Sequence, residues 1–280
     1  MTAAKIIKAG VTGWPVEHSR SPRLHGFWLR EYGIAGSYER YAVSPTDFPT
    51  FIRDLAQQGF AGVNVTIPHK EAALRLVDRV ADSAARCGAV NTIVVGADGR
   101  LTGSNTDGFG FLENLRAGFS GFDAAKGPAV VLGAGGAARA IVAALLDAGA
   151  PEVRLLNRTR DRAVVLAGLV GGQVRVLDWD RRGAALEDAA LLVNTTSLGM
   201  QGQPALDISL AALPATALVN DIVYAPLVTD LLQAARQRGN PVVDGIGMLL
   251  HQARPGFAAW FGVEPMVTPA LRAAVLGSSA

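Results

Sequence analysis

The segment from residue 129 to residue 156 constrains the fold of this chain most. Ala129–Leu132 is a short apolar run that is typical of a buried strand, and it ends in the glycine-rich turn Gly133–Gly136. An apolar helical pattern follows, and Val153–Leu156 is predicted to be the next strand. A strand, a glycine turn, a helix and a second strand in this order predict a βαβ unit with parallel strands.

The same alternation predicts two domains. Short apolar runs separated by helical patterns continue to Val242–Val243, which indicates a doubly wound, Rossmann-like parallel sheet. A chain of 280 residues is long enough for a second domain, and the residues before 108 form their own series of strands and helices. We therefore predict an α/β fold with one domain over residues 1–107, to which residues 245–280 return, and another over residues 108–244.

The N-terminal domain yields several local predictions. Ser21 precedes Pro22, which is typical of a helix N-cap followed by proline at the first helical position. The apolar pattern from Asp47 predicts a helix that runs to Gln58 and ends at Gly59. Three further predictions are a strand with Val63, Val65 and Ile67 on one face, a strand over Asn91–Val95, and a turn at Asp98–Gly99.

Composition excludes several classes of protein. The single cysteine, Cys87, cannot form an intrachain disulfide or a cysteine-rich metal cluster, and the four histidines lack ligand-like spacing, so no metal is expected. A formal net charge of +2 is too small to attract nucleic acid or a membrane strongly. Met1–Gly10 has no signal-peptide pattern and the uncharged stretch Ala189–Leu206 is too polar to span a bilayer, so we expect a cytoplasmic protein.

The glycine turn matches a dinucleotide-binding fingerprint. In Gly133-Ala-Gly-Gly-Ala-Ala138, Gly133 permits the tight turn, Gly135 allows a pyrophosphate to approach the backbone, and Ala138 keeps the helix close to the sheet. The start of the following helix offers unpaired N–H groups and a positive dipole to phosphates. Such a motif alone can be a simple strand-to-helix turn. The strand before it and the helix and strand after it favour cofactor binding.

The end of the next strand favours NADP over NAD. An NAD site usually places an acid there to accept hydrogen bonds from the ribose hydroxyls. This chain has Asn157-Arg-Thr-Arg-Asp-Arg162 instead, and guanidinium groups suit a 2′-phosphate by charge and by geometry. Arginines also commonly cover protein surfaces, but these lie at the strand end. Asp161 is a weaker candidate for the missing acid, so exclusive use of NADP is left open.

Five polar residues outside the cofactor segment are candidates for chemistry. Ser19 and Ser21 can hold a carboxylate or ring hydroxyls, although Ser21 alone is explained as an N-cap. Lys70 follows the strand end at Thr66 and is a candidate acid/base, although a lone lysine is usually a surface charge. Asp107 is either another N-cap or the acid that orients Lys70.

Eight segments together resemble the shikimate dehydrogenase family. They follow one another in the family's order over nearly the whole chain, which makes the resemblance specific. The segments are Gly13 to His25, Asn64-Val-Thr-Ile-Pro-His-Lys70, Gly88-Ala-Val-Asn-Thr92, Asn105-Thr-Asp107, Gly133-Ala-Gly-Gly-Ala-Ala138, Asn157-Arg-Thr159, Asn194-Thr-Thr-Ser-Leu-Gly-Met200 and Asp244-Gly-Ile-Gly-Met-Leu-Leu-His-Gln252.

The resemblance implies reversible, NADPH-dependent reduction of 3-dehydroshikimate to shikimate in chorismate and aromatic amino-acid biosynthesis. It implies an N-terminal substrate domain, an NADP-binding Rossmann domain and a monomer or homodimer. Lys70 and Asp107 would be the catalytic pair. The substrate contacts would be Ser19, Ser21, Thr66, Asn91, Tyr224 and Gln252. The cofactor contacts would be Asp82, Gly133, Ala134, Gly135, Gly136, Ala137, Asn157, Arg158, Thr159, Arg162, Thr195, Ile222, Gly245 and Met248.

Two positions depart from the family pattern, and two other functions stay open. Gly26 replaces a common asparagine, and His69 stands where phenylalanine is frequent. We interpret His69 as a packing substitute; the alternative is that a charged His69 repels the Lys70 ammonium and promotes loss of its proton. One other function is a quinate/shikimate dehydrogenase that uses NAD or both cofactors. The second is a non-catalytic NADP-binding regulator, against which the presence of Lys70 and Asp107 argues.

Overall fold

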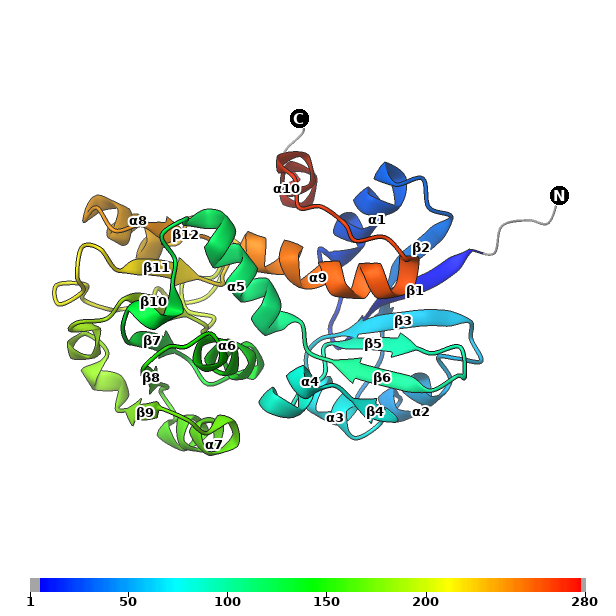
Figure 1. Cartoon of the computed structure of the whole chain (residues 1–280), viewed down its shortest axis with the longest axis horizontal. Helices are drawn as coiled ribbons and strands as arrows, with labels where there is room; N and C mark the ends of the chain where they lie inside the picture. The colour runs from blue at the N-terminus through cyan, green and yellow to red at the C-terminus, as the bar shows by residue number, and fades with distance from the viewer. Residues whose placement is uncertain (1–5, 278–280) are drawn as a thin grey trace. The chain divides into compact units, whose positions relative to one another are not determined.

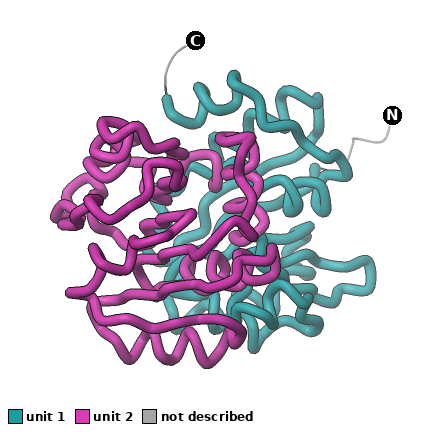
Figure 2. Tube along the Cα trace, turned by 60° about the vertical axis from the view of Figure 1, so that its left-hand side comes forward, with its two compact units in different colours: residues 1–106, 250–280 teal, residues 107–249 magenta. Residues whose placement is uncertain are grey.

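The protein divides into two compact units, shown as a computed structural model in Figures 1 and 2. The structure describes residues 6–277, so the predicted domain limits at residues 1 and 280 lie outside the described residues. Unit 1 combines residues 1–106 with residues 250–280, and unit 2 comprises residues 107–249. Each unit has its own six-stranded sheet.

The sheet of unit 1 is mixed and has the order β2-β1-β3-β5-β6-β4. β1 lies parallel to both β2 and β3, whereas β5 runs antiparallel to β3 and β6. One edge of the sheet therefore carries the ends of β1, β3 and β6 and the start of β5. The strands are β1 (Ile7–Gly13), β2 (Gly36–Ala42), β3 (Phe60–Val65), β4 (Arg79–Val80), β5 (Thr92–Val95) and β6 (Leu101–Ser104).

Helices from both ends of the chain belong to unit 1. The second part of α9 (Ile246–Phe261) and the whole of α10 (Pro269–Leu276) fall in it, and α10 contacts α1 (Ser21–Glu31). Trp260 of α9 donates from Nε1 to the carbonyl oxygen of Ile93 at 3.0 Å, which ties this helix to β5. The remaining helices of the unit are α2 (Phe48–Arg53), α3 (Lys70–Leu74) and α4 (Asp82–Cys87).

Three local predictions for unit 1 are wrong. Ser21 is the first residue of α1 rather than its N-cap, because its hydroxyl bonds to Tyr38 and Arg20 occupies the cap position. The helix expected over residues 47–58 ends at Arg53, and separate turns continue to Gly59. Ile67 lies beyond the end of β3 and is 66% exposed, so it does not share the buried face of Val63 and Val65.

The sheet of unit 2 is fully parallel, as predicted. Its order is β9-β8-β7-β10-β11-β12. This is the doubly wound order, in which successive strands are added outward on one side of β7 and then, from β10 on, on its other side. The strands are β7 (Ala129–Leu132), β8 (Val153–Leu156), β9 (Val174–Leu177), β10 (Leu191–Asn194), β11 (Leu218–Asp221) and β12 (Val242–Val243). The connecting helices are α5 (Asp107–Gly118), α6 (Gly136–Asp147), α7 (Arg160–Val170) and α8 (Asp230–Gln237).

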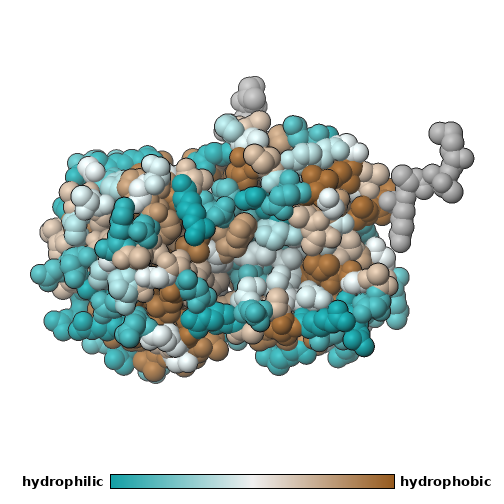
Figure 3. Space-filling model, viewed as in Figure 1, coloured by the Kyte–Doolittle hydropathy of each residue, from teal (hydrophilic) through white to brown (hydrophobic). Residues whose placement is uncertain are grey.

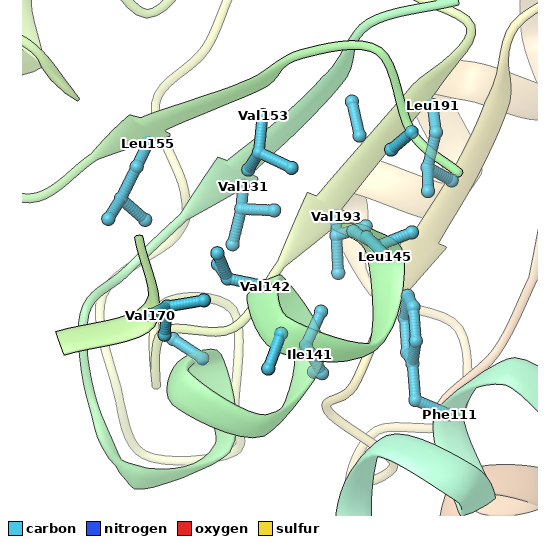
Figure 4. Close-up of a cluster of buried hydrophobic side chains, with 14 of the residues drawn as sticks. Phe111, Val131, Ile141, Val142, Leu145, Val153, Leu155, Val170, Leu191 and Val193 are labelled. Carbon is cyan, nitrogen blue, oxygen red and sulfur yellow. The ribbon is translucent and has the colours of Figure 1, made fainter. Parts of the chain in front are cut away.

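The core of unit 2 lies between the sheet and its helices. Val131, Val153 and Val193 of three strands pack with Ile141 and Leu145 of α6, all at 0% exposure (Figure 4). β7 is buried on both faces and is a continuous apolar run, and for that reason it was readable in the sequence. Ala138 of the glycine motif is also fully buried in this cluster, which agrees with its predicted role in close helix packing.

The surface carries no large uniform patch in the view of Figure 3, where hydrophilic and hydrophobic residues are interspersed. Scattered exposed apolar side chains of this kind are normal for a folded protein. Among residues 6–277, none of the helices has both the length and the apolar character needed to cross a bilayer.

A buried histidine makes unit 1 sensitive to acid. His25 of α1 is fully buried, and its ring stacks on Tyr38 with 3.8 Å between ring centroids. Neither ring nitrogen has a hydrogen-bond partner within residues 6–277. Burial lowers the pKa of His25 from 6.5 to about 3, so the folded protein keeps this ring neutral.

We predict that His25→Phe reduces the acid sensitivity of folding. Because the unfolded histidine binds a proton below pH 6.5 and the folded one does not, the folding equilibrium constant falls by about tenfold per pH unit below that value. Urea unfolding at about pH 7.5, 6.5 and 5.5 measures the free energies of unfolding of wild type and variant. The difference between the two should change in favour of the variant as the pH falls. Parallel pH profiles would contradict the prediction.

Candidate active site

The predicted substrate residues of unit 1 arise mainly from one edge of its sheet. In the strand register, Thr12 pairs with Val65 and Asn64 pairs with Thr92, which in turn pairs with Ser104. The segments that follow β1, β3 and β6, and the segment that precedes β5, therefore begin side by side. These segments carry four of the predicted residues and Lys70.

Ser21 is the first residue of α1 and Ser19 lies two residues before it, and hydrogen bonds to their backbone groups hold both serines in place. Arg40 of β2 donates from Nε and Nη2 to the carbonyl oxygen of Ser19, at 3.1 and 2.6 Å. The N–H of Ser21 donates to Ser19 Oγ at 3.3 Å. Both serines are half-buried, so their hydroxyls remain within reach of a small ligand.

Tyr38 and Asn64 extend the serine site, and neither was predicted as a site residue. The Tyr38 hydroxyl donates to Asn64 Oδ1 at 2.6 Å and also bonds to Ser21. Asn64 Nδ2 donates to Thr92 Oγ1 at 3.0 Å, and to the carbonyl oxygen of Asn91 at 3.2 Å. Burial raises the pKa of Tyr38, so its hydroxyl stays protonated and acts as a donor.

Asn91 is fixed in one orientation. Its side chain is 4% exposed, and Oδ1 accepts from the Thr106 N–H and from Thr92 Oγ1, both at 2.9 Å. Nδ2 donates to Thr106 Oγ1 at 3.1 Å. Thr106 immediately precedes Asp107, so this network determines how the chain leaves β6 and enters α5.

Thr66 and Lys70 are placed by backbone bonds at the same edge. The Thr66 N–H donates to Thr12 O at 2.9 Å, and Val90 N–H donates to Lys70 O at 2.9 Å. Lys70 is half-buried and begins α3. These bonds tie the segment after β3 to the end of β1 and to the segment before β5.

His69 packs inside unit 1. Its ring is 2% exposed and stacks on Phe48 with 4.1 Å between centroids and 6° between planes. Nε2 bonds to the carbonyl oxygen of Val43 at 2.7 Å, and because a carbonyl only accepts, Nε2 carries a proton. These contacts favour the interpretation of His69 as a packing substitute for an aromatic ring.

The other predicted substrate and catalytic residues are divided between the units. Gln252 is half-buried in α9 and belongs to unit 1. Asp107 is 2% exposed and is the first residue of α5 and of unit 2. Tyr224 follows β11 in unit 2. Among the predicted cofactor residues, only Asp82 lies in unit 1, where it begins α4 and is exposed.

The switch point of the parallel sheet in unit 2 holds Gly133 and Thr195. Gly133 has φ +110°, and a Cβ at this position would lie 2.6 Å from Thr195 Oγ1, so glycine is required. Thr195 Oγ1 in turn donates to Leu132 O at 2.7 Å. In doubly wound sheets, ligands bind outside the carboxyl ends of the strands at this point.

The start of α6 has the features of a phosphate site. Gly135 and Gly136 are exposed, and a Cβ added to either would meet no atom within 4 Å. No side chain caps the helix, and its first turn has no acidic residue. Open space next to unpaired N–H groups at a helix N-terminus suits the pyrophosphate of a dinucleotide.

The end of β8 presents exposed cations. Asn157 Nδ2 donates to Thr159 O at 2.8 Å, which shapes the turn into α7. Arg158 and Arg162 are exposed and take part in no ion pair within the described part of the chain. Thr159 is the N-cap of α7, but its side chain makes no capping bond. These groups suit a 2′-phosphate.

A buried acid joins the ends of β10 and β11. Asp221 is 0% exposed and accepts from Thr229 Oγ1 at 2.7 Å, Asn194 Nδ2 at 3.0 Å and Val223 N–H at 3.0 Å. Burial raises the pKa of this carboxyl despite these bonds. Asp221 was not predicted as a site residue, although its bonds hold the segments that carry Thr195 and Ile222.

The last predicted cofactor residues surround the start of α9. A Cβ on Gly245 would collide with the carbonyl oxygen of Ile222, so these two segments approach closely. Met248 is 7% exposed and belongs to the apolar cluster of unit 2, with Ile222 packed against that cluster. Met248 therefore contributes to the core in addition to any cofactor contact.

Comparisons with known proteins agree with this arrangement. The model of the shikimate dehydrogenase substrate binding domain matches residues 11–93, and that of shikimate / quinate 5-dehydrogenase matches residues 117–200. The NADP(+) shikimate dehydrogenase of Paramagnetospirillum magneticum is 63% identical over 274 residues, which are 98% of this chain and 99% of the relative. The chain belongs to the shikimate dehydrogenase family.

Solved structures of shikimate and quinate dehydrogenases share this fold. The shikimate 5-dehydrogenase of Thermus thermophilus, in complex with NADP(H) and shikimate, has a TM-score of 0.86 and 39% identity over 98% of this chain and 100% of that one. The quinate dehydrogenase of Corynebacterium glutamicum, in complex with NAD, has a TM-score of 0.90 and 32% identity over 97% and 99%. The predictions of this family, an α/β fold and an NADP-dependent oxidoreductase are confirmed.

We predict that Gly135→Ala weakens NADPH binding at least about tenfold and leaves the fold intact, because its methyl group occupies the space that the pyrophosphate needs. Gly168→Ala in α7 is the matched control, since a Cβ there also meets nothing within 4 Å. Fluorescence titration measures the affinity and thermal unfolding measures stability. Equal NADPH affinity in both variants would contradict the assignment.

Proposed function

We propose that this chain catalyses the reversible, NADPH-dependent reduction of 3-dehydroshikimate to shikimate in chorismate and aromatic amino-acid biosynthesis. The main support is the pairing of two site types in one chain of this family. The sheet of unit 1 presents hydroxyls, an oriented amide and Lys70 at one edge. The sheet of unit 2 presents an open glycine turn that suits a dinucleotide. Unit 1 is then the substrate domain and unit 2 the NADP domain.

The cofactor residues divide by the part of NADP that they would hold. Gly133–Ala137 and the start of α6 would bind the pyrophosphate. Asn157, Arg158, Thr159 and Arg162 would surround the 2′-phosphate. Thr195, Ile222, Gly245 and Met248 would line the nicotinamide, with Asp82 as a further contact. The bound cofactor supplies the hydride for the reduction.

The substrate residues of unit 1 are already ordered by the protein. Ser19, Ser21, Thr66, Asn91 and Gln252, together with Tyr224 of unit 2, would contact the substrate carboxylate and hydroxyls. The bonds of Asn91 to Thr92 and Thr106 hold its amide in place before a ligand arrives. Groups that are already in place lower the entropic cost of binding and catalysis.

Lys70 and Asp107 would carry the proton chemistry. As hydride reaches the carbonyl carbon, negative charge grows on the oxygen, and the Lys70 ammonium donates a proton to it to give the alcohol. Asp107 would accept hydrogen bonds from lysine and substrate and hold them in register. In the reverse direction, neutral Lys70 accepts the proton of the alcohol.

We further propose that the protein acts in the cytoplasm as a monomer or homodimer.

A quinate dehydrogenase activity with NAD is the second candidate. The likeness to the quinate dehydrogenase of Corynebacterium glutamicum, with its TM-score of 0.90, favours testing it. Absorbance assays with shikimate and quinate, each with NADP and NAD, compare the four combinations. We expect the largest kcat/KM for shikimate with NADP. A larger value for quinate with NAD would replace the first proposal by the second.

We predict that Lys70→Ala lowers kcat by about 10²–10⁴ and keeps the fold, because general acid–base catalysis contributes that range. The control is Lys126→Ala, which removes another lysine whose Nζ only donates to Gly121 O. Steady-state rates and thermal unfolding of both variants give the comparison. Near-normal turnover in Lys70→Ala would remove this lysine from the mechanism.

A further inference from the structure

An acid stands at the carboxyl end of β9, where the roles proposed above assign no residue. β7, β8 and β9 pair in parallel with Leu132, Leu156 and Leu177 in register. The residues that follow them, Gly133, Asn157 and Asp178, therefore line the same edge of the sheet. Asp178 is thus next to the strand end that carries the proposed 2′-phosphate residues.

Asp178 forms an ion pair with the middle arginine of that segment. Arg160 Nε lies 2.9 Å from Asp178 Oδ1, and the two side chains are 56% and 62% exposed. Arg160 is the first residue of α7 and lies between Arg158 and Arg162 in the sequence. Within residues 6–277, neither of those two arginines has an ion-pair partner.

The ion pair changes the charge that a phosphate meets. The segment 157–162 contains three arginines and one acid, Asp161, and Asp178 cancels one of its two remaining positive charges. A phosphate monoester carries about −1.5 to −2 charges at neutral pH. Such a ligand is repelled by Asp178, and the repulsion persists over about 8 Å at physiological ionic strength.

We propose that Asp178 is a specificity-determining residue that moderates the preference of this chain for NADP over NAD. It holds Arg160 at the β9 side, leaves Arg158 and Arg162 as the phosphate partners, and places a negative charge near the 2′-phosphate. The inference rests on the proposed function, since it takes the 2′-phosphate to lie at the start of α7.

The pair contributes little to stability, which makes it suitable for substitution. Exposed ion pairs in proteins contribute little to the stability of the fold. Loss of the pair should therefore change ligand affinity without unfolding the protein. Thermal unfolding of each variant checks this directly.

The experiment measures binding of two nucleotides that differ only in the 2′-phosphate. Isothermal titration calorimetry on the full chain compares adenosine 2′,5′-bisphosphate with adenosine 5′-monophosphate. The variants are Asp178→Asn, Arg160→Gln and the double variant. Asp180→Asn is the matched control, because Asp180 is also exposed and forms no ion pair among residues 6–277.

Asp178→Asn should tighten binding of the bisphosphate by about two- to fivefold and leave the monophosphate unchanged. Arg160→Gln leaves Asp178 uncompensated and should weaken the bisphosphate by about the same factor. The double variant should return to within about twofold of wild type, and the differences should shrink at about 0.5 M salt. Asp180→Asn should leave the ratio of the two affinities unchanged.

Four outcomes overturn the inference. Weaker bisphosphate binding by Asp178→Asn would mean that the pair orders the site instead. Equal weakening in Arg160→Gln and the double variant would mean that Arg160 contacts the phosphate itself. Equal effects of Asp178→Asn and Asp180→Asn on the ratio of the two affinities would mean that Asp178 has no special role. If wild type does not distinguish the two nucleotides, the 2′-phosphate site of the proposed function fails as well.

Discussion

The parallel register of the strands in unit 2 is the constraint on which its candidate site depends. Because backbone hydrogen bonds align Leu132 with Leu156, and Leu156 with Leu177, three strands end at one edge. The order in which strands are added to the sheet reverses between β7 and β10, and Gly133 and Thr195 meet at this switch point. The residues that follow β7, β8 and β10 therefore place the parts of the proposed dinucleotide site at this edge.

Unit 1 uses buried polar bonds for the same purpose. Tyr38, Asn64, Asn91 and Thr106 form a connected network whose donors and acceptors largely satisfy one another. Buried polar groups are costly without partners, so this network holds a single arrangement. The amide of Asn91, a proposed substrate contact, is therefore held in one orientation by the protein itself.

The strands of unit 2 were largely readable from the sequence, whereas several elements of unit 1 were not. β7 has the predicted bounds Ala129–Leu132, because a strand buried on both faces is a continuous apolar run, and β8 and β12 also have their predicted bounds. β2 was missed because Gly36–Ala42, at the edge of its sheet, is neither a continuous apolar run nor an alternation of apolar and polar residues. The helix over residues 47–58 was predicted too long, since periodicity does not show where tertiary packing ends a helix.

The sequence by itself determined the family, the glycine turn, the cationic strand end that favours NADP, and Lys70 as the candidate acid. Local patterns carry these features, because each depends on residues close together in the chain. Only the tertiary structure revealed the bond of Tyr38 to Asn64 and the pairing of Arg160 with Asp178. These partners lie 26 and 18 positions apart, and the arrangement of strands and helices in the folded protein brings them together. No spacing rule along the chain encodes such contacts.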